Sequence, residues 1–134
     1  MDQSKNEVSD EELKKVIADF LDQGHVENIV AMFRRDPSYY TWTGDLLQDE
    51  RLSVRIGISV LFEELHLIQP EQLALATPSL AQLLDSENPQ LRGEAVSILG
   101  IINTPETLLL IQRMQNDPNP QVQEMVQLVL EELE

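Results

Sequence analysis

Apolar residues recur every three or four positions along most of the chain, which is the spacing of amphipathic helices. Two such stretches lie within 9–36, with Gly24 between them as the left-handed residue that ends a helix. Ser9 followed by Glu12 is the pattern of a capping box at the start of the first stretch. We therefore expect a helical hairpin over 9–36, preceded by a flexible tail over 1–8.

The next stretches predict helices over 39–48 and 52–67. Within the second, residues 53–60 alternate polar and apolar positions, which would also suit a strand. The length of the whole stretch and its helical neighbours favour a helix. Pro70 suits the first position of the following helix, and Pro78 predicts that this helix is kinked or split in two.

Three further helices are expected in the last third of the chain. Pro89 opens the first, and Thr104 followed by Pro105 is a start signal for the second, with Thr as the N-cap and Pro at the first helical position. The segment 117–120, Asp-Pro-Asn-Pro, turns the chain into the last helix. The pattern as a whole predicts an all-α protein.

Three short segments, 49–55, 86–92 and 117–123, can be aligned with one another. Each follows an apolar helix and opens another, and each places an apolar residue just inside the new helix. The second begins 37 residues after the first, and the third begins 31 residues after the second. Helical hairpins that repeat at this interval are typical of α-solenoids.

A turn Asp, then an apolar residue and Arg at the start of the second helix, resembles the HEAT repeat family in its short bacterial form. The resemblance covers about residues 38–134, and it implies a right-handed α-α superhelix, a short α-solenoid of about three to four helical hairpins. The expected division is an N-terminal capping hairpin over 9–36 and repeats over 38–68, 70–103 and 104–134, all in a single domain over 9–134.

In that family the turn Asp and the helix Arg pair between neighbouring repeats and form a ladder. The resemblance implies this structural role for Asp49, Arg55 and Arg92. Ser86 and Gln123 depart from the pattern, because the second repeat lacks the acid and the third lacks the Arg. The ladder is therefore expected to be incomplete.

The charge of the chain narrows the classes of partner. It holds 24 Asp and Glu against 9 Lys and Arg, a formal charge of −15. Such a surface opposes binding to nucleic acid and to anionic membranes, and it favours a protein partner with a basic surface. No apolar run reaches the roughly 18 residues of a membrane span, and the start lacks the features of a signal peptide, so we expect a cytoplasmic protein.

Candidate chemistry is sparse. The chain has no cysteine, which excludes disulfides and thiolate metal sites. His25 and His66 lie far apart without a carboxylate motif, the glycines form no phosphate-binding loop, and no nucleophile elbow occurs. We expect neither an enzyme nor a bound cofactor or metal.

Two groups of residues are candidates for contacting a partner. Tyr39, Tyr40 and Trp42 bring three aromatic residues together, as binding anchors or as packing between the first hairpin and the repeats. The second group lies on the second helices, which line the concave face in HEAT-like proteins; its members could instead contact the adjacent repeat. These positions are Arg55, Ser59 and Glu63, then Arg92 and Val96, then Gln123 and Gln127.

The sequence therefore predicts a non-catalytic protein–protein interaction module or scaffold that uses the concave face of a short solenoid. The alternative is an accessory or maturation factor for another enzyme, since phycobilin lyases are HEAT-like proteins that assist cofactor attachment. A monomer or a weak homodimer that pairs through the last helix is expected.

Overall fold

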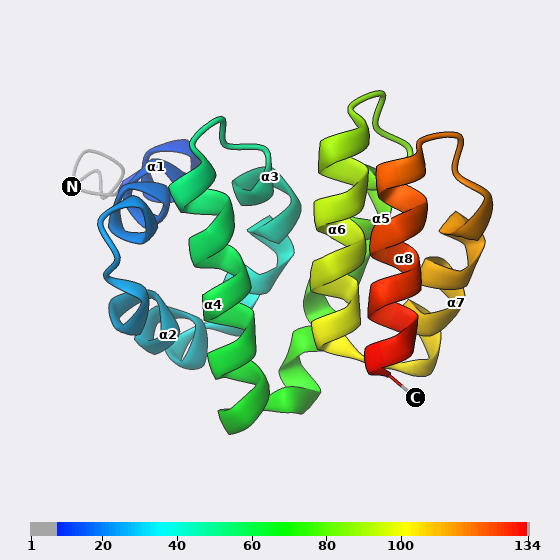
Figure 1. The fold of residues 1–134 in the computed structure, drawn as a ribbon. Coiled ribbons are helices and arrows are strands. Elements are labelled where there is room, and N and C mark those ends of the chain that lie inside the picture. Colours follow the sequence, from blue (N-terminus) through cyan, green and yellow to red (C-terminus); the bar gives the residue numbers. More distant parts are fainter. Residues whose placement is uncertain (1–7, 134) are drawn as a thin grey trace.

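The computed structural model describes residues 8–133, which form eight α-helices and three 3-10 helices, with no strand in that range (Figure 1). The tail expected over 1–8 lies outside the described residues except for Val8. The helices are α1 (Asp10–Asp22), α2 (Val26–Arg35), η2 (Pro37–Trp42), α3 (Thr43–Leu47), α4 (Leu52–Ile68), η3 (Pro70–Ala76), α5 (Thr77–Leu83), α6 (Pro89–Ile102), α7 (Pro105–Arg113), η4 (Met114–Asn116) and α8 (Pro120–Glu132).

The local signals at the helix ends act as the sequence predicts. Ser9 Oγ accepts the backbone N–H of Glu12 at 3.1 Å, and its hydroxyl donates to the Glu12 carboxylate. Gly24 has a φ of 83°, so it supplies the left-handed turn between α1 and α2. Thr104 caps α7 through the N–H of Thr107, at 3.1 Å.

The single helix expected over 39–48 is wrong. Pro37 and the Asp36 side chain, which accepts the N–H of Ser38, start the 3-10 helix η2 instead, and the chain becomes α-helical only at Thr43. The next segment repeats this design, because η3 passes into α5 at Thr77. The split expected at Pro78 is confirmed.

Helix α4 settles the ambiguous stretch 53–60 in favour of a helix. Its buried side chains share one face at helical spacing, as the large ones show: Val54, Ile58, Leu61, Phe62 and Leu65. An alternating strand would have buried every second residue instead. The polar residues of 53–60 therefore do not share one face, as they would in a strand.

The helices form two layers (Figure 1). Helices α4, α6 and α8 lie side by side in the front layer, and α6 contacts both of the others. The pairs η2–α3 and η3–α5, together with α7, lie behind them, and a continuous apolar core fills the space between the layers. In 8–133, the structure places no helix that is long and apolar enough to cross a membrane.

Close approaches between helices depend on small residues. The backbone N–H of Gly44 in α3 donates to Ser79 Oγ of α5 at 3.0 Å, and a Cβ at residue 44 would lie 2.6 Å from the Ser79 carbonyl oxygen. A Cβ at Gly100 of α6 would lie 2.5 Å from Cγ1 of Val129 in α8. Helices α3 and α5 therefore meet at backbone distance, and α6 approaches α8 so closely that the Val129 side chain lies against the Gly100 backbone.

Candidate functional site

The three aligned segments share one local structure. In each, the side chain at the equivalent position near the start of the second helix donates a hydrogen bond to the backbone carbonyl six residues earlier. The bonds join Arg55 to Asp49 at 3.0 Å, Arg92 to Ser86 at 2.8 Å and Gln123 to Asp117 at 2.5 Å. In the third segment Gln123 therefore makes the same hydrogen bond to the turn backbone as Arg55 and Arg92 make in the first two.

Among residues 8–133, one pair of the kind that the ladder predicts, a turn Asp with a helix Arg, joins neighbouring segments. Arg92 makes two parallel bonds to the Asp117 carboxylate, at 2.8 and 2.9 Å, and the Asp117 side chain is 4% exposed. These bonds lower the pKa of Asp117 below its ordinary value, against the opposing effect of burial. Buried bidentate pairs of this kind hold the register between elements.

Asp49 and Arg55, which the resemblance places in the ladder, form no Asp–Arg pair with a neighbouring segment among the described residues. Arg51 binds the carboxylate of Asp49 and thereby lowers the pKa of Asp49. Arg55 reaches forward to Glu94 of α6, with 3.0 Å between its Nε and the carboxylate. The physical reason is that Ser86, at the position equivalent to Asp117, has no carboxylate to offer.

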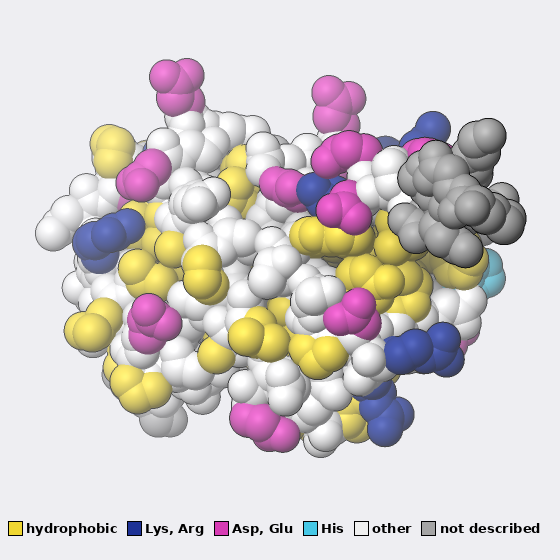
Figure 2. Space-filling view, turned by 180° about the vertical axis from the view of Figure 1, so that it is seen from behind, with side chains coloured by type: hydrophobic (Ala, Val, Ile, Leu, Met, Phe, Trp, Pro, Cys, Tyr) yellow, Lys and Arg dark blue, Asp and Glu magenta, His cyan; other side chains and the backbone are white. Residues whose placement is uncertain are grey.

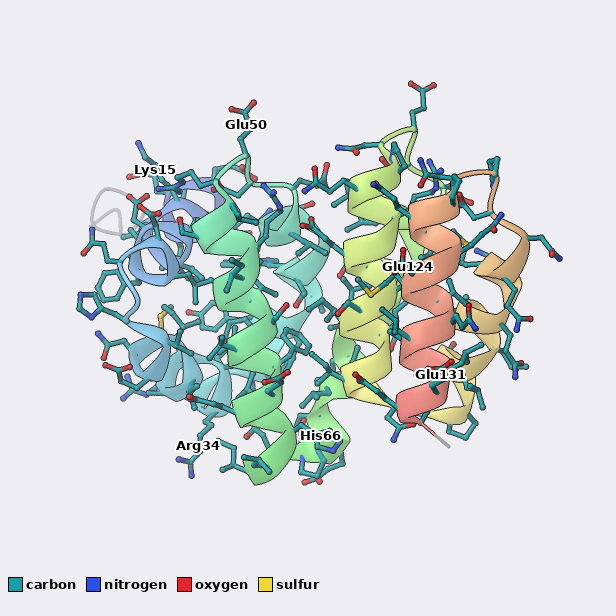
Figure 3. All side chains as sticks on the ribbon, viewed as in Figure 1. Lys15, Arg34, Glu50, His66, Glu124 and Glu131 are labelled. Carbon is teal, nitrogen blue, oxygen red and sulfur yellow. The ribbon has the colours of Figure 1, made fainter. Side chains whose placement is uncertain are left out.

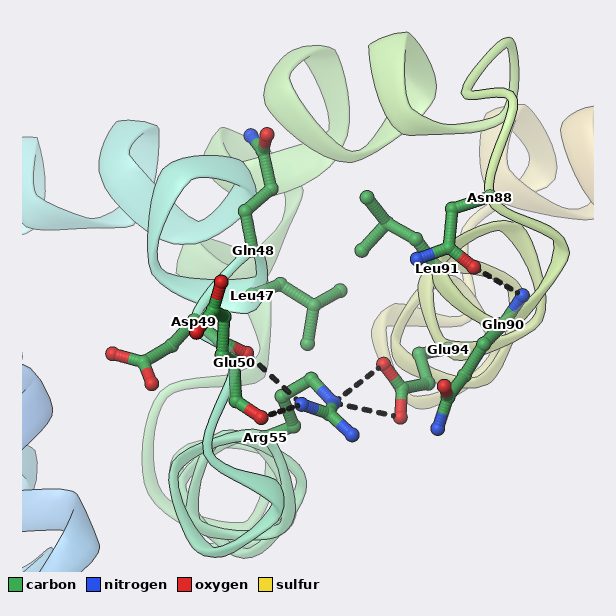
Figure 4. A pocket seen from close by; sticks show the side chains of 9 residues that line it. All are labelled: Leu47, Gln48, Asp49, Glu50, Arg55, Asn88, Gln90, Leu91 and Glu94. Atoms are coloured by element: carbon green, nitrogen blue, oxygen red, sulfur yellow. Dashed lines mark hydrogen bonds and ion pairs between the residues drawn. The ribbon is translucent and has the colours of Figure 1, made fainter.

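A hollow of about 260 Å³ lies between the α3–α4 turn and the start of α6 (Figure 4). Arg55 lies in this hollow, but its Nε and Nη1 are engaged by Glu94 and by the carbonyls of Asp49 and Glu50. The guanidinium therefore serves the packing of α4 against α6. Its remaining capacity for an anionic ligand is small.

The aromatic cluster is divided between the core and the surface. Tyr40 is fully buried, with its ring centroid 5.0 Å from that of Phe33 and 6.0 Å from that of Phe62. Its hydroxyl accepts a hydrogen bond from Gln69 at 2.7 Å, and burial raises its pKa. The expectation that Tyr40 contacts a partner is therefore wrong, because it packs at the junction between the first hairpin and the rest.

Tyr39 and Trp42 remain half-buried, with ring centroids 5.1 Å apart. Lys14 lies 5.4 Å from the Trp42 ring and forms an ion pair with Asp45 at 2.7 Å. Figure 2 shows hydrophobic side chains gathered on the rear face, most densely over its N-terminal half. A hollow of about 620 Å³ lies beside Tyr39 and is lined mainly by residues of α2, among them Met32.

The positions expected to face a partner on the second helices divide in the same way. Val96 is fully buried in α6, so the expectation that it contacts a partner is wrong. Ser59 is half-buried, whereas Glu63 of α4 and Gln123 and Gln127 of α8 are exposed. Arg55 and Arg92 are committed to the ion pairs described above, as the alternative of contact with the adjacent repeat predicts.

The sequence alone did not single out an exposed apolar stripe on the front layer. Leu52, Ile56, Val60 and Leu67 lie on the side of α4 opposite its buried face, and we call them the apolar ridge. Ile56 is 53% exposed and Leu67 is 82% exposed. The signal in the sequence is the i, i+4, i+8 spacing of the first three, which form a second apolar stripe on the same helix.

Across the front layer, equivalent positions of the three aligned segments form rows. One row is Ile56, Gly93 and Glu124, and the next is Val60, Ser97 and Leu128, by the spacings of 37 and 31 residues. In both rows the middle helix, α6, carries the smallest side chain. Glu124 and Glu131 project from the outer side of α8 (Figure 3).

No group of three or more His, Cys, Asp or Glu within 8–133 is arranged to hold a metal ion. His66 is half-buried at the end of α4, and its Nδ1 has no hydrogen-bond partner among the described residues. His25 is exposed and is the N-cap residue of α2.

Comparison of the chain with models of protein families, with curated proteins and with solved structures found no match.

Proposed function

We propose that this chain is a non-catalytic protein-binding module: a short, right-handed HEAT-like solenoid whose front helices α4, α6 and α8 receive another protein. The repeated carbonyl bonds of Arg55, Arg92 and Gln123 support the solenoid interpretation. The side-by-side order of the three helices supports it as well, because stacked hairpins expose one helix of each pair on the same face.

The observation that carries the proposal is the apolar ridge. Leu52 and Ile56 each leave more than half of their surface in water, at 56% and 53% exposed, and Leu67 leaves more. A single exposed Leu is ordinary, but four apolar residues aligned along one helix are not. A partner that covers them would gain about 25 cal/mol of binding free energy for each Å² of apolar surface removed from water.

Charge favours a basic partner for this face. The ridge includes no Lys or Arg, and Glu63 lies exposed beside it. The net charge of −15 steers basic proteins towards the chain and repels acidic ones. The alternative role, assistance in attaching a cofactor to another protein, is supported by the resemblance alone.

The experiment is affinity capture from an extract of the source organism with three forms of the chain. These are the natural sequence, Ile56→Asp in the apolar ridge, and the control Leu109→Asp, at a residue that is 68% exposed on α7 in the rear layer. A protein partner retained by the natural chain and the control but lost with Ile56→Asp supports the proposal. Equal retention by all three forms, or retention by none, would contradict it.

A further inference from the structure

Two junctions hold the front layer together, and equivalent stripes of side chains face them. The first junction lies between α4 and α6, and the second lies between α6 and α8. In α4 the stripe is Arg55, Ser59 and Glu63, at the i, i+4, i+8 spacing of one helix face. Because Arg55 meets Glu94 of α6, this stripe faces the first junction.

The equivalent stripe of α6, which lies 37 residues further along the chain, faces the second junction. It consists of Arg92, Val96 and Gly100. Arg92 makes its two bonds to Asp117 in the turn before α8, and Gly100 lies against Val129 of α8. The two stripes therefore allow the junctions to be compared position by position.

The first junction is packed more loosely than the second. Val96 and Gly100 are both buried in the second junction. Their equivalents in the first junction are Ser59, which is half-buried, and Glu63, which is exposed. The first junction therefore lacks the buried contacts that hold α6 and α8 together along this stripe.

The ion pairs of the two junctions differ in the same direction. The Asp117 side chain is 4% exposed and receives two bonds from Arg92. The Glu94 side chain is 25% exposed, and a hollow of about 260 Å³ lies beside its contact with Arg55 (Figure 4). Within 8–133, this contact is the sole hydrogen bond or ion pair that joins α4 directly to α6. A partly exposed ion pair is weak, and salt screens it.

The rear layer gives the first junction a fixed point. There α3, which packs on α4, meets α5, which packs on α6. The backbone N–H of Gly44 donates to Ser79 Oγ at 3.0 Å, and a Cβ at residue 44 would overlap the Ser79 carbonyl group. This contact leaves no room for the two halves of the stack to approach each other at the rear. Movement between the halves is therefore easiest at the front.

We propose that the first junction is a hinge: α4 swings away from α6 about the contact of Gly44 with Ser79, and the ion pair of Arg55 with Glu94 is the latch of the closed state. Hinges of this kind rotate groups of packed elements about a few contacts. One group is α1 to α4, and the other is α5 to α8, which the second junction holds together. Opening moves the apolar ridge away from α6 and α8, so the shape of the front face depends on the latch.

The test measures distances across both junctions in the full chain. Because the sequence has no cysteine, spin labels attach only where a cysteine is introduced. Ser53, Gln90 and Gln121 are exposed and occupy equivalent positions. Ser53→Cys with Gln90→Cys forms the first pair of labels, across the first junction, and Gln90→Cys with Gln121→Cys forms the second pair. By electron paramagnetic resonance we expect the distance distribution of the first pair to be about twice as wide.

Glu94→Gln tests the latch. It removes the charge of Glu94 and leaves the bonds of Arg55 to the carbonyls of Asp49 and Glu50 intact. It should shift the first pair of labels to longer distances and leave the second pair unchanged. The matched control Glu87→Gln removes the same charge from an exposed residue that has no ion pair within 8–133, so it should change neither pair.

Salt provides a second test of the latch. At about 1 M salt the Debye length falls to about 3 Å, so the ion pair weakens in the natural chain. The first pair of labels should then shift as it does with Glu94→Gln, whereas salt should add little to the shift in Glu94→Gln itself. Circular dichroism of each labelled variant confirms that it is folded.

Equally narrow distributions for the two pairs would overturn the hinge. A first pair at one long distance that responds neither to Glu94→Gln nor to salt would overturn it as well, because the junction would then be open but rigid. The proposed function has a separate outcome. Affinity capture with Ile56→Asp tests the apolar ridge whether or not the hinge moves, and the label distances are measured without a partner.

Discussion

Replacing Gly93 and Gly100 by Ala, one at a time, should change the stability of the protein in opposite directions. Both residues lie within α6, so each substitution gains the same helix propensity, about 0.8–1 kcal/mol. This common contribution cancels when the two variants are compared. What remains is the packing of a single methyl group at two places in the same helix.

The structure makes those two places very different. At Gly93 the new Cβ has no atom within 4 Å, so Gly93→Ala should raise the free energy of unfolding by about 0.8 kcal/mol. At Gly100 it would lie 2.5 Å from Cγ1 of Val129, about 1 Å inside the normal contact distance between carbon atoms. Overpacking of this kind costs about 1–3 kcal/mol, so Gly100→Ala should lower stability by up to about 2 kcal/mol.

Urea unfolding followed by circular dichroism measures both changes, and the slope of each transition shows whether unfolding remains two-state. In thermal unfolding the two variants should differ by roughly 3–5 °C for each kcal/mol. If Gly100→Ala proved as stable as Gly93→Ala, α6 and α8 would not be packed as closely as described.

Other substitutions test individual contacts. Asp117→Asn should cost about 2 kcal/mol at neutral pH, because hydrogen bonds to charged groups such as Arg92 contribute roughly 1.5–3 kcal/mol. The folded state lowers the pKa of Asp117, so the carboxylate stabilises above its unfolded pKa of about 3.9 and this contribution is lost as the pH falls through the folded pKa. The gap between the natural chain and Asp117→Asn in urea unfolding should therefore close below about pH 4, and a gap independent of pH would refute the assignment. Tyr40→Phe should cost about 1 kcal/mol by removing the acceptor of the Gln69 amide, and Tyr40→Ala about 3–5 kcal/mol by opening a cavity; equal effects in thermal unfolding would contradict the buried position. Asn103 ends α6 with a φ of 54°, so Asn103→Gly should leave the melting temperature nearly unchanged while Asn103→Ala lowers it by an amount equivalent to about 1 kcal/mol.

Much of the helical framework could be predicted because helix ends depend on neighbours in sequence. Ser9, Gly24 and Thr104 each act within four residues of their own position, and each prediction for them is confirmed. The helix expected over 39–48 failed for a related reason. A 3-10 helix and an α-helix share nearly the same apolar spacing over six residues, so the pattern does not separate η2 from α3.

The candidate site was less accessible from the sequence. Val96 and Ser59 occupy equivalent positions, yet Val96 is buried and Ser59 is not, because Gly100 draws α6 closely against α8. Ile56 and Val60 have the apolar side chains of core residues. They are exposed because α4 packs its other apolar stripe against the core. Which of the two stripes is buried depends on contacts with the neighbouring helices, and the sequence pattern of α4 does not contain that information.

The sequence by itself determined the helical class, most of the places where helices begin and end, and the charge of −15. These properties depend on backbone geometry, on capping groups within one turn, and on a sum over side chains, none of which requires knowledge of distant contacts. The tertiary structure alone decided which stripe of α4 faces water, which carboxylate Arg55 meets, and that Gly100 of α6 lies against Val129 of α8. Such properties arise where residues more than 30 positions apart meet, as Arg55 and Glu94 do, and their pairing is set by how whole helices pack.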